Sequence, residues 1–401
     1  MNPERLLEQE KISYARVSPP CPVFGACGGC SLQDLAYEDQ LALKRQRLSR
    51  AFAPLDGMPA WELIGLEEPW RYRNKAEFTF GSADGTLTLG YHAARSFWRI
   101  VDFEDCLLMP EAAMRATRLV LRLATEAGLS AYHPRTHEGF FRYLLVRASR
   151  ASGRLLLCLM TAPGPREPIE RMAEAIRAQE PAVASCYWGV TARLADIAVP
   201  ETLTRLWGEE LFEERVGPFT VQLHPLSFLQ PSLVQAERMY DRLSEAVAGF
   251  SDGTGWDLYC GIGLAGFYLA RRVRKVYGVD SEPHHLKLAE ANAARNGVGN
   301  IEFKFGKVET LLMDRRFWLQ EAKPDVVVVD PPRAGLHPQA LSSLLAARPR
   351  RIVYFSCNAQ SLVRDLAVLL KSFPRYRLAS AQAYDMFPQT NHVETVLVLE
   401  R

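Results

Sequence analysis

Short apolar runs alternate with segments of helical periodicity throughout residues 226–401. The four valines of DVVVVD follow one another directly, which is typical of parallel strands that helices bury on both faces. We predict strands in five ranges: 255–260, 275–280, 301–305, 325–330 and 351–355. Because helical segments separate these strands, the pattern predicts an α/β fold with a doubly wound sheet.

The ends of two further elements can be predicted in this region. A helix is expected from Pro283 to Asn296, with Ser281 as its N-cap and Gly297 as its stop. After the last helix, two strand-like segments at 375–386 and 393–400 follow each other with no helix between them. We therefore expect an antiparallel pair to complete the sheet.

The first half of the chain has a different pattern. Residues 60–225 consist mainly of short alternating strands with turn signals, interrupted by helices near 110–128 and 167–179. An amphipathic helix is expected before them, from Leu32 to Phe52. The chain is thus predicted to have three parts: 1–52, a cysteine-rich loop and a helix; 53–225, a β-rich central domain; and 226–401, the doubly wound domain.

Composition supports an ordinary globular protein. The 401 residues allow two or three domains, and 48% of them are hydrophobic and 23% charged. The N-terminus is charged from residue 4, which is unlike a signal peptide. No run reaches the ~18 apolar residues that a membrane helix needs. We expect a cytoplasmic monomer without a membrane segment.

The net charge of +2 does not by itself indicate a nucleic-acid-binding protein. Two stretches, 70–100 and 132–154, nevertheless concentrate basic and aromatic side chains. The basic residues are Arg71, Arg73, Lys75, Arg95, Arg99, Arg135, Arg142, Arg147, Arg150 and Arg154, and the rings are Tyr72, Phe78, Phe80, Tyr91, Phe97, Trp98, Phe140, Phe141 and Tyr143. Arginines with stacking rings suit single-stranded RNA. A solvated sheet face over an ordinary core would look the same, so both interpretations stay open here.

The stretch DLYCGIGLAG, residues 257–266, carries a nucleotide-binding pattern. Gly261, Gly263 and Gly266 fit G-x-G-x-x-G, and Asp280 follows at 280 − 261 = 19 residues. Such a turn lets the backbone approach a ligand, while an acid that ends the second strand binds ribose hydroxyls. NAD and S-adenosylmethionine both carry this ribose, so the loop alone leaves the two cofactors open.

The ends of the fourth and fifth predicted strands separate these cofactors. They carry DPPR, residues 330–333, and FSCN, residues 355–358. An NAD enzyme would need a histidine or lysine as acid or base there, and the nearby His337 stands beside Pro338 in a loop. A D-P-P loop after strand four is typical of methyltransferases that act on bases.

Several motifs in order resemble the S-adenosylmethionine-dependent RNA 5-methyluridine methyltransferases. They are YRNKAEF, SFLQPS, DLYCGIGLAG, DPPRAGLH, YFSCNAQSLVRDL and FPQTNHVETVLVLER. The segment CPVFGACGGCSLQDLAYEDQLALKRQRL, residues 21–48, resembles the iron–sulfur subgroup of that family, the bacterial 23S rRNA uracil-5-methyltransferases. The resemblance implies a class I methyltransferase domain that methylates carbon 5 of a uridine in RNA, with 23S rRNA as substrate and tRNA as the alternative.

Methylation at carbon 5 of uracil needs two side chains, because this carbon is a weak nucleophile. A thiolate adds to carbon 6, and a base later removes the carbon-5 proton. The resemblance implies that Cys357, after the apolar run RIVYFS, is the nucleophile and that Glu394, in NHVETV, is the base. Cys260 is interpreted as a small structural residue, and His392 receives no role.

The resemblance also implies the residues that bind S-adenosylmethionine. Asp280 would bind the ribose hydroxyls, Tyr259 would flank the adenosine and Gln230 would line the methionine end. Asp330 would face both the cofactor and the uracil.

The remaining cysteines fall into two groups. Cys21, Cys27 and Cys30 have the spacing C-x5-C-x2-C, which is close to plant-type iron–sulfur ligation but also permits zinc. The resemblance adds Cys106 as a fourth ligand and favours a four-iron–four-sulfur (4Fe-4S) cluster that braces the fold or the RNA surface. A disulfide framework does not suit a cytosolic chain. The last two, in LLLCLM and VASCYWG, are expected in the core.

Many members of the family carry a small RNA-binding β-barrel before the cluster. Only 20 residues precede Cys21 here, so ISYARV, residues 12–17, is interpreted as a remnant of that barrel or as a late start. RNA affinity is then expected to depend on the central region and on the helix end Lys44–Arg50. Two other classes remain as alternatives: a non-catalytic RNA-binding or assembly factor with this fold, and an NAD-dependent oxidoreductase with an iron–sulfur centre.

Overall fold

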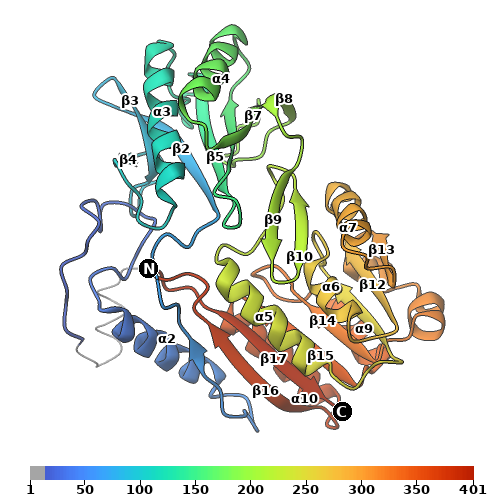
Figure 1. The fold of residues 1–401 in the computed structure, drawn as a ribbon. Helices are drawn as coiled ribbons and strands as arrows, with labels where there is room; N and C mark the ends of the chain where they lie inside the picture. Colours follow the sequence, from blue (N-terminus) through green and yellow to red (C-terminus); the bar gives the residue numbers. More distant parts are fainter. Residues whose placement is uncertain (1–13) are drawn as a thin grey trace.

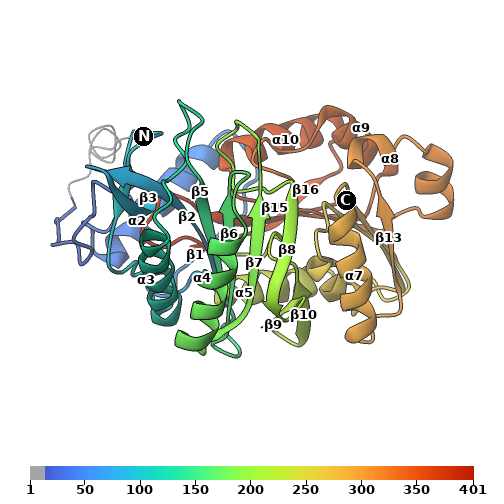
Figure 2. The ribbon, with the colours of Figure 1, turned by 90° about the horizontal axis from the view of Figure 1, so that it is seen from above.

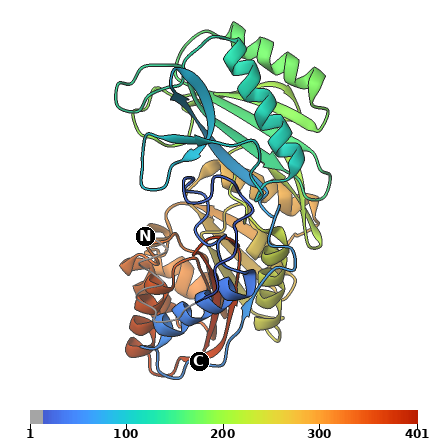
Figure 3. The ribbon, with the colours of Figure 1, turned by 90° about the vertical axis from the view of Figure 1, so that its left-hand side faces the viewer.

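The computed structural model describes residues 14–401, apart from the side chain of Glu321. Two large sheets dominate it and lie in separate lobes, which Figures 1 and 3 show from two sides. Residues 12 and 13 of the ISYARV segment lie outside the described range. In the part of the chain that is described, no helix combines the length and the apolar character that a bilayer span requires.

The eight-stranded sheet contains all the strands predicted in the C-terminal region. Its order is β1-β16-β17-β15-β14-β11-β12-β13. The strands are β1 (Leu63–Ile64), β11 (Thr254–Leu258), β12 (Lys275–Asp280), β13 (Ile301–Phe305), β14 (Val326–Val329), β15 (Arg351–Ser356), β16 (Arg377–Tyr384) and β17 (Glu394–Glu400). Strands β11 to β15 are parallel, and β17 is antiparallel to both β15 and β16. The prediction of a doubly wound sheet closed by an antiparallel pair is confirmed.

Helices cover both faces of this sheet. They are α2 (Tyr37–Phe52), α5 (Leu233–Ala246), α6 (Leu264–Ala270), α7 (Pro283–Arg295), α8 (Val308–Leu311), α9 (Pro338–Ala347), α10 (Ala359–Ser372) and the π-helix Phe317–Glu321. Val326 and Val328 of β14 join the core with α5 and α6, whereas Val327 and Val329 join the opposite core with α2, α9 and α10. Continuous apolar runs were therefore the correct sign of a sheet buried on both faces.

The predicted start of α7 at Pro283 is confirmed, but its predicted N-cap and the predicted start of α2 were wrong. Helix α7 begins at Pro283 with Glu282 as its N-cap, since proline prefers the first helical position and fixes the cap one residue before it. The carboxylate of Asp280 accepts the Glu282 N–H at 2.9 Å, so Ser281 is not needed as a cap. The predicted stop is confirmed, because Gly297 has φ +67° directly after the helix. Helix α2 begins at Tyr37 instead of Leu32, since the preceding residue has extended backbone.

The central region forms a seven-stranded sheet in the order β4-β3-β2-β5-β6-β7-β8. Its strands are β2 (Lys75–Ala83), β3 (Thr86–His92), β4 (Ile100–Asp102), β5 (Phe141–Ala148), β6 (Leu155–Thr161), β7 (Val183–Val190) and β8 (Thr202–Gly208). Helices α3 (Glu111–Glu126) and α4 (Glu167–Gln179) lie together along it, as Figure 2 shows from above. Cys158 and Cys186 are buried in the cores of this lobe, as expected.

Three segments from the first part of the chain pack against the C-terminal sheet. Helix α2 and β1 contribute to its core, and so does the hairpin of β9 (Phe212–Val216) and β10 (Phe219–Leu223). The domain limits at 52 and 225 stay a prediction. In space, however, α2 and the β9–β10 hairpin pack with the eight-stranded sheet.

Most of the aromatic residues in 70–100 and 132–154 belong to the core. Phe78, Phe80, Phe140, Phe141 and Tyr143 are buried. Successive side chains of a strand point to opposite faces, so rings two residues apart share one face, here the buried one. The exceptions are Phe97, with 82% of its surface exposed, and Trp98, with 58% exposed. Arg142 and Arg147 are also buried. The two stretches are therefore mainly a sheet over its core, with a small exposed aromatic loop.

Candidate active site

Five predicted site residues lie at one edge of the eight-stranded sheet. Tyr259, Asp280, Asp330 and Cys357 stand at or just after the carboxyl ends of β11, β12, β14 and β15, and Glu394 begins the antiparallel β17. Ser356 pairs with Thr395, so the residues next to them, Cys357 and Glu394, meet at the same edge. The order of the strands reverses between β11 and β14, and such switch points are where doubly wound sheets bind ligands.

The Gly-rich loop and Asp280 form the first half of the site. Gly261 and Gly263 have positive φ values of 54° and 90°, so the backbone turns directly into α6. The Gly261 N–H donates to Asp280 Oδ2 at 2.9 Å, and His285 Nδ1 lies 3.2 Å from Oδ1. Burial alone would raise the pKa of Asp280, but these hydrogen bonds and the Glu282 N–H lower it below its ordinary value. The carboxylate therefore stays ionised and can accept hydrogen bonds from hydroxyl groups.

A cavity of about 820 Å³ opens beside this loop, which is within the usual size of a small-molecule site. Tyr259 and Asp280 line it together with residues 307–309 and the loop before α9. His337, also in the lining, caps α9, because its Nδ1 accepts the Gln339 N–H at 3.2 Å. That role leaves it unsuited to acid–base catalysis on a nicotinamide.

The second half of the site contains Cys357, Glu394, Asp330 and Arg333. Glu394 is buried, and burial raises its pKa well above the ordinary value, while Asp330 raises it further and Arg333 opposes the shift. Burial raises the pKa of Asp330 to about 6. The pKa of the Cys357 thiol is also raised by burial and by Glu394, and Arg333 lowers it. Asp330 and Arg333 are therefore close enough to the Cys357 thiol and the Glu394 carboxyl group for their charges to change the pKa values of both groups.

Arg333 and Asp257 were missed as functional candidates. Arg333 stands in DPPR, and it is the cation that lowers the pKa of both Cys357 and Glu394. Asp257 begins DLYCGIGLAG, is only 1% exposed and has two carboxylate oxygens without a hydrogen bond of normal geometry, although the Gly266 amide acts on its pKa. In both cases the signal was a charged residue inside a motif that also carries other site residues.

The buried acceptors indicate what the site can bind. Burial raises the pKa of Asp257 to about 7, against the opposing Gly266 amide, and Asp330 and Asp280 raise it further. Gln230 Oε1 is likewise buried without a partner. Buried acceptors without donors are costly, so a ligand that carries positive charge and N–H groups would stabilise them. S-adenosylmethionine, with an ammonium and a sulfonium group, fits this requirement.

The central lobe positions Gln230. Asn74, in the motif YRNKAEF, donates through Nδ2 to the Gln230 carbonyl at 2.6 Å and through its backbone N–H to Pro231 at 3.1 Å. The buried Arg147 donates to the carbonyls of Pro225 and Ser227. The motif SFLQPS is therefore fixed from outside its own domain.

The four N-terminal candidate ligands also come together. Cys21, Cys27, Cys30 and Cys106 line one small cavity of about 20 Å³. Burial raises the pKa of Cys27 to about 11 and of Cys30 to about 12, and the neighbouring cysteines add to both shifts. Within residues 14–401, no three His, Cys, Asp or Glu side chains are arranged to ligate a single metal ion.

The remaining sequence predictions have mixed outcomes. Cys260 is buried, and burial raises its pKa well above the ordinary value, which suits a structural residue. His392 is exposed and lies 3.4 Å from Arg333 Nη2. Lys44 does not form part of an exposed basic helix end, because it is buried in an ion pair.

The fold and the site define the class of the protein: an α/β methyltransferase fold with a site for a nucleoside cofactor. Comparison with known proteins agrees. Residues 218–401 match the family model described as tRNA (Uracil-5-)-methyltransferase. The chain is similar to an uncharacterized RNA methyltransferase of Halalkalibacterium halodurans (35% identity, covering 99% of this chain and 86% of the relative). An uncharacterized RNA methyltransferase of Enterococcus faecalis is similar too (36% identity, covering 98% and 86%).

A solved structure gives the same result. The tRNA (uracil-54, C5)-methyltransferase of Pyrococcus abyssi, in complex with S-adenosyl-L-homocysteine, has a TM-score of 0.77 and 30% identity and covers 96% of this chain and 86% of its own. The chain belongs to the RNA uracil-5-methyltransferase family, and it is an S-adenosylmethionine-dependent RNA (uracil-C5)-methyltransferase. This excludes the non-catalytic factor and the NAD-dependent oxidoreductase.

Proposed function

We propose that the enzyme methylates its uridine through a covalent bond between Cys357 and carbon 6, and that Glu394 is the base that resolves this adduct. The proposal is carried by one observation, the meeting of a half-buried thiol and a buried carboxyl group at the end of β15 and the start of β17.

The proposed reaction takes place at carbons 5 and 6 of the uracil ring. The Cys357 thiolate adds to carbon 6, and the electrons of the 5,6 double bond move to carbon 5, making it nucleophilic. S-adenosylmethionine, when bound, would supply the methyl group that carbon 5 takes up; the electrons of the sulfur–methyl bond would stay on the sulfur, and S-adenosylhomocysteine would leave. Glu394 then removes the carbon-5 proton, the electrons of that C–H bond re-form the double bond, and the carbon 6–sulfur bond breaks to release the thiolate.

Arg333 supports both roles. Its charge lowers the pKa of the Cys357 thiol and that of Glu394, and thus favours the reactive form of each. We assign Gln230, Tyr259, Asp280 and Asp330 to the cofactor. Asp257 belongs with them because of its unpaired oxygens.

Binding of S-adenosylmethionine is expected to weaken as the pH falls below about 7, the pKa of Asp257. A cationic ligand binds the ionised carboxylate, and this form is present above the pKa and lost below it. The dissociation constant should rise about tenfold per pH unit as the pH falls below 7, and it should be lowest between pH 7 and about 8, where the ligand's own α-ammonium group begins to lose its proton. Isothermal titration calorimetry from pH 5.5 to 8.5 measures this, and Asp257→Asn should bind weakly at every pH. A level profile in the unmodified enzyme would contradict the assignment.

We propose that RNA approaches over the loop between β3 and β4. Phe97 and Trp98 are the exposed rings of this loop, and Arg135 lies over the Trp98 ring at 5.2 Å from its centroid. A cavity of about 260 Å³ beside them is lined by Tyr132 and His133, among others. Exposed rings next to arginines suit bases of a single-stranded segment.

Replacing Trp98 by Ala is expected to weaken RNA binding at least about fivefold, because stacking of one base contributes roughly 1–3 kcal/mol. The rate at saturating RNA and the affinity for S-adenosylmethionine should not change. Filter binding with the substrate RNA measures the effect, and Trp98→Phe serves as the matched control because it retains a ring. Equal RNA affinity of Trp98→Ala and the unmodified enzyme would exclude this loop as a stacking surface.

We further propose that Cys21, Cys27, Cys30 and Cys106 hold a 4Fe-4S cluster. The cavity that all four cysteines line supports it, together with the C-x5-C-x2-C spacing in the sequence. The cluster would supply a rigid link rather than redox chemistry. The Gly28 N–H donates to His92 and the Ala94 N–H to Ala26, both near 2.9 Å, so this segment is attached to the β3–β4 loop.

Iron analysis tests the cluster. Protein purified without oxygen should be brown and contain about four iron atoms per chain, and Cys30→Ser should lose both colour and iron. Cys186→Ser is the matched control, since that cysteine is buried elsewhere. Stoichiometric zinc without iron would overturn the proposal.

For the substrate, we propose 23S rRNA, supported by the cysteine segment. The Pyrococcus abyssi enzyme is described as acting on uracil 54 of tRNA, which keeps tRNA as the second candidate. Mapping 5-methyluridine in rRNA and tRNA of cells with and without the gene decides between them. Loss from tRNA alone would replace the first candidate by the second.

A further inference from the structure

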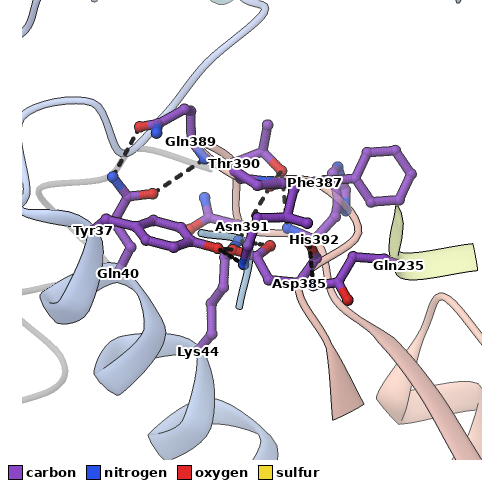
Figure 4. Close-up of polar contacts among 12 residues, drawn as sticks. Tyr37, Gln40, Lys44, Gln235, Asp385, Phe387, Gln389, Thr390, Asn391 and His392 are labelled. Atoms are coloured by element: carbon purple, nitrogen blue, oxygen red, sulfur yellow. Dashed lines mark hydrogen bonds and ion pairs between the residues drawn. The ribbon is translucent and has the colours of Figure 1, made fainter. Parts of the chain in front are cut away.

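One face of α2 is directed at the segment Asp385–Val393, which joins β16 to β17. Tyr37, Gln40, Lys44 and Arg47 are spaced so that they lie along one side of a helix, and each contacts this segment (Figure 4). The segment is nine residues long, from 385 to 393, between two adjacent antiparallel strands. Tight hairpin connections have two to about five residues, so this longer one needs support from outside.

A buried ion pair holds the first part of the segment. Lys44 Nζ lies 2.6 Å from Asp385 Oδ1, and both side chains are 0% exposed. Lys44 also donates to the Phe387 carbonyl at 3.2 Å, and the Tyr37 hydroxyl donates to Asp385 Oδ2 at 2.9 Å. The charge of Asp385 is thus paired and its second oxygen satisfied.

A pair of amides holds the middle. Gln40 Nε2 donates to Gln389 Oε1 at 2.8 Å, and the Gln389 N–H donates back to Gln40 Oε1 at 3.1 Å. The Gln389 carbonyl accepts the N–H groups of Ser31 and Leu32, which directly follow Cys30. Gln389 has φ +67°, a conformation that a non-glycine residue keeps only when its surroundings hold it.

The last part of the segment leads to Glu394. Arg47 donates to Asn391 Oδ1 at 2.6 Å, three residues before the carboxyl group. The ring of His392 packs against Phe387 and lies beside Arg333. Each of the four α2 side chains donates a hydrogen bond to the connecting segment. Helix α2 also packs against α10, the helix that follows Cys357.

We propose that α2 positions the base Glu394, with Gln40, Lys44 and Asp385 as positioning residues that fix the connection on which this carboxyl group depends. The inference rests on the proposed role of Glu394. It extends that role by joining the cysteine segment and α2 to one chemical step, the removal of the carbon-5 proton. We expect the polar contacts of α2 to act on this step and not on the addition of Cys357 or on cofactor binding, because they hold the connection before Glu394.

The test compares formation and resolution of the covalent protein–RNA adduct in Gln40→Met. This variant keeps the length of the side chain and removes the amide pair. We expect adduct to form at the rate of the unmodified enzyme but to accumulate during turnover, with kcat lowered about tenfold and KM for S-adenosylmethionine unchanged. Glu38→Gln, an exposed change on the first turn of α2, is the matched control and should behave as the unmodified enzyme.

Glu394→Gln on the same RNA separates the positioning role from the role of the base. Accumulation of adduct in Glu394→Gln but not in Gln40→Met would overturn the positioning role and leave the base assigned. No accumulation in Glu394→Gln would overturn the base, and the positioning role with it. A Gln40→Met enzyme in which adduct formation and turnover slow by the same factor would also overturn the inference, because that is the behaviour of a merely structural defect. The neutral double variant Lys44→Met/Asp385→Asn provides a second, independent disturbance of the same segment and is expected to accumulate adduct too.

Discussion

Glu394→Gln is expected to convert the enzyme into a form that stays covalently attached to its RNA through Cys357. The amide cannot take the carbon-5 proton, so the carbon 6–sulfur bond does not break after methyl transfer. Turnover should fall by about 10²–10⁴-fold, the usual contribution of a general base. The product is a protein–RNA band that survives denaturing electrophoresis and carries the methyl label.

Two cysteines serve as controls for this result. Cys357→Ala should form no adduct, alone or combined with Glu394→Gln, and should have no measurable activity. Cys260→Ala should trap adduct in the Glu394→Gln background, because Cys260 lies buried in the Gly-rich loop. An adduct that persists without Cys357, or disappears without Cys260, would reverse the assignment of the nucleophile.

The sequence predicted the eight-stranded sheet well because its signals are local. A run such as VVVV is stable only where apolar layers cover both faces of the strand. The helical segments between the strands then leave few alternatives to a parallel sheet. The motifs at the strand ends then follow, since parallel strands bring their carboxyl ends to one edge. Cys357 and Asp280 could be selected in this way, whereas Glu394, which begins an antiparallel strand, was indicated by the family resemblance.

A first group of features could not be predicted because they depend on contacts between residues that are far apart in the chain. Lys44 was assigned to a basic helix end, but its partner Asp385 is 341 residues away, and nothing local shows that this lysine is buried. The role of Asn74 in holding Gln230 depends on a contact across 156 residues. Propensity and motif spacing do not contain such pairs, so the support around the site emerges only from the folded chain.

A second group of errors came from ignoring the strand period. Phe78 and Phe80 were counted as candidate RNA contacts, yet residues two apart in a strand share a face, and this face is the core. Phe97 and Trp98 lie outside the strands, between β3 and β4, where the period does not apply. The same composition is therefore compatible with an RNA-binding surface and with a buried sheet face. Only the position of each ring inside or outside a strand distinguishes the two.

Lys44→Met is expected to have the largest effect on stability. Removing the cation leaves the Asp385 carboxylate buried without its partner, and loss of one member of a buried pair costs about 3–5 kcal/mol of unfolding free energy. Asp385→Asn should cost a similar amount, because the ammonium group is then buried alone. The shift of the urea midpoint, with the slope unchanged, measures each loss.

The double variant Lys44→Met/Asp385→Asn should recover most of that stability, because no charge remains buried, and Tyr37 can still bond to the amide. If the double variant instead lost as much unfolding free energy as the two single variants together, the two side chains would not be coupled. If the pair is coupled, stability and catalysis separate in this double variant. It should unfold almost like the unmodified enzyme and still accumulate adduct, because a neutral pair no longer fixes the connection before Glu394. If the enzyme with this neutral pair is stable but catalytically slow, the main role of the Lys44–Asp385 ion pair is to hold the base Glu394 in position.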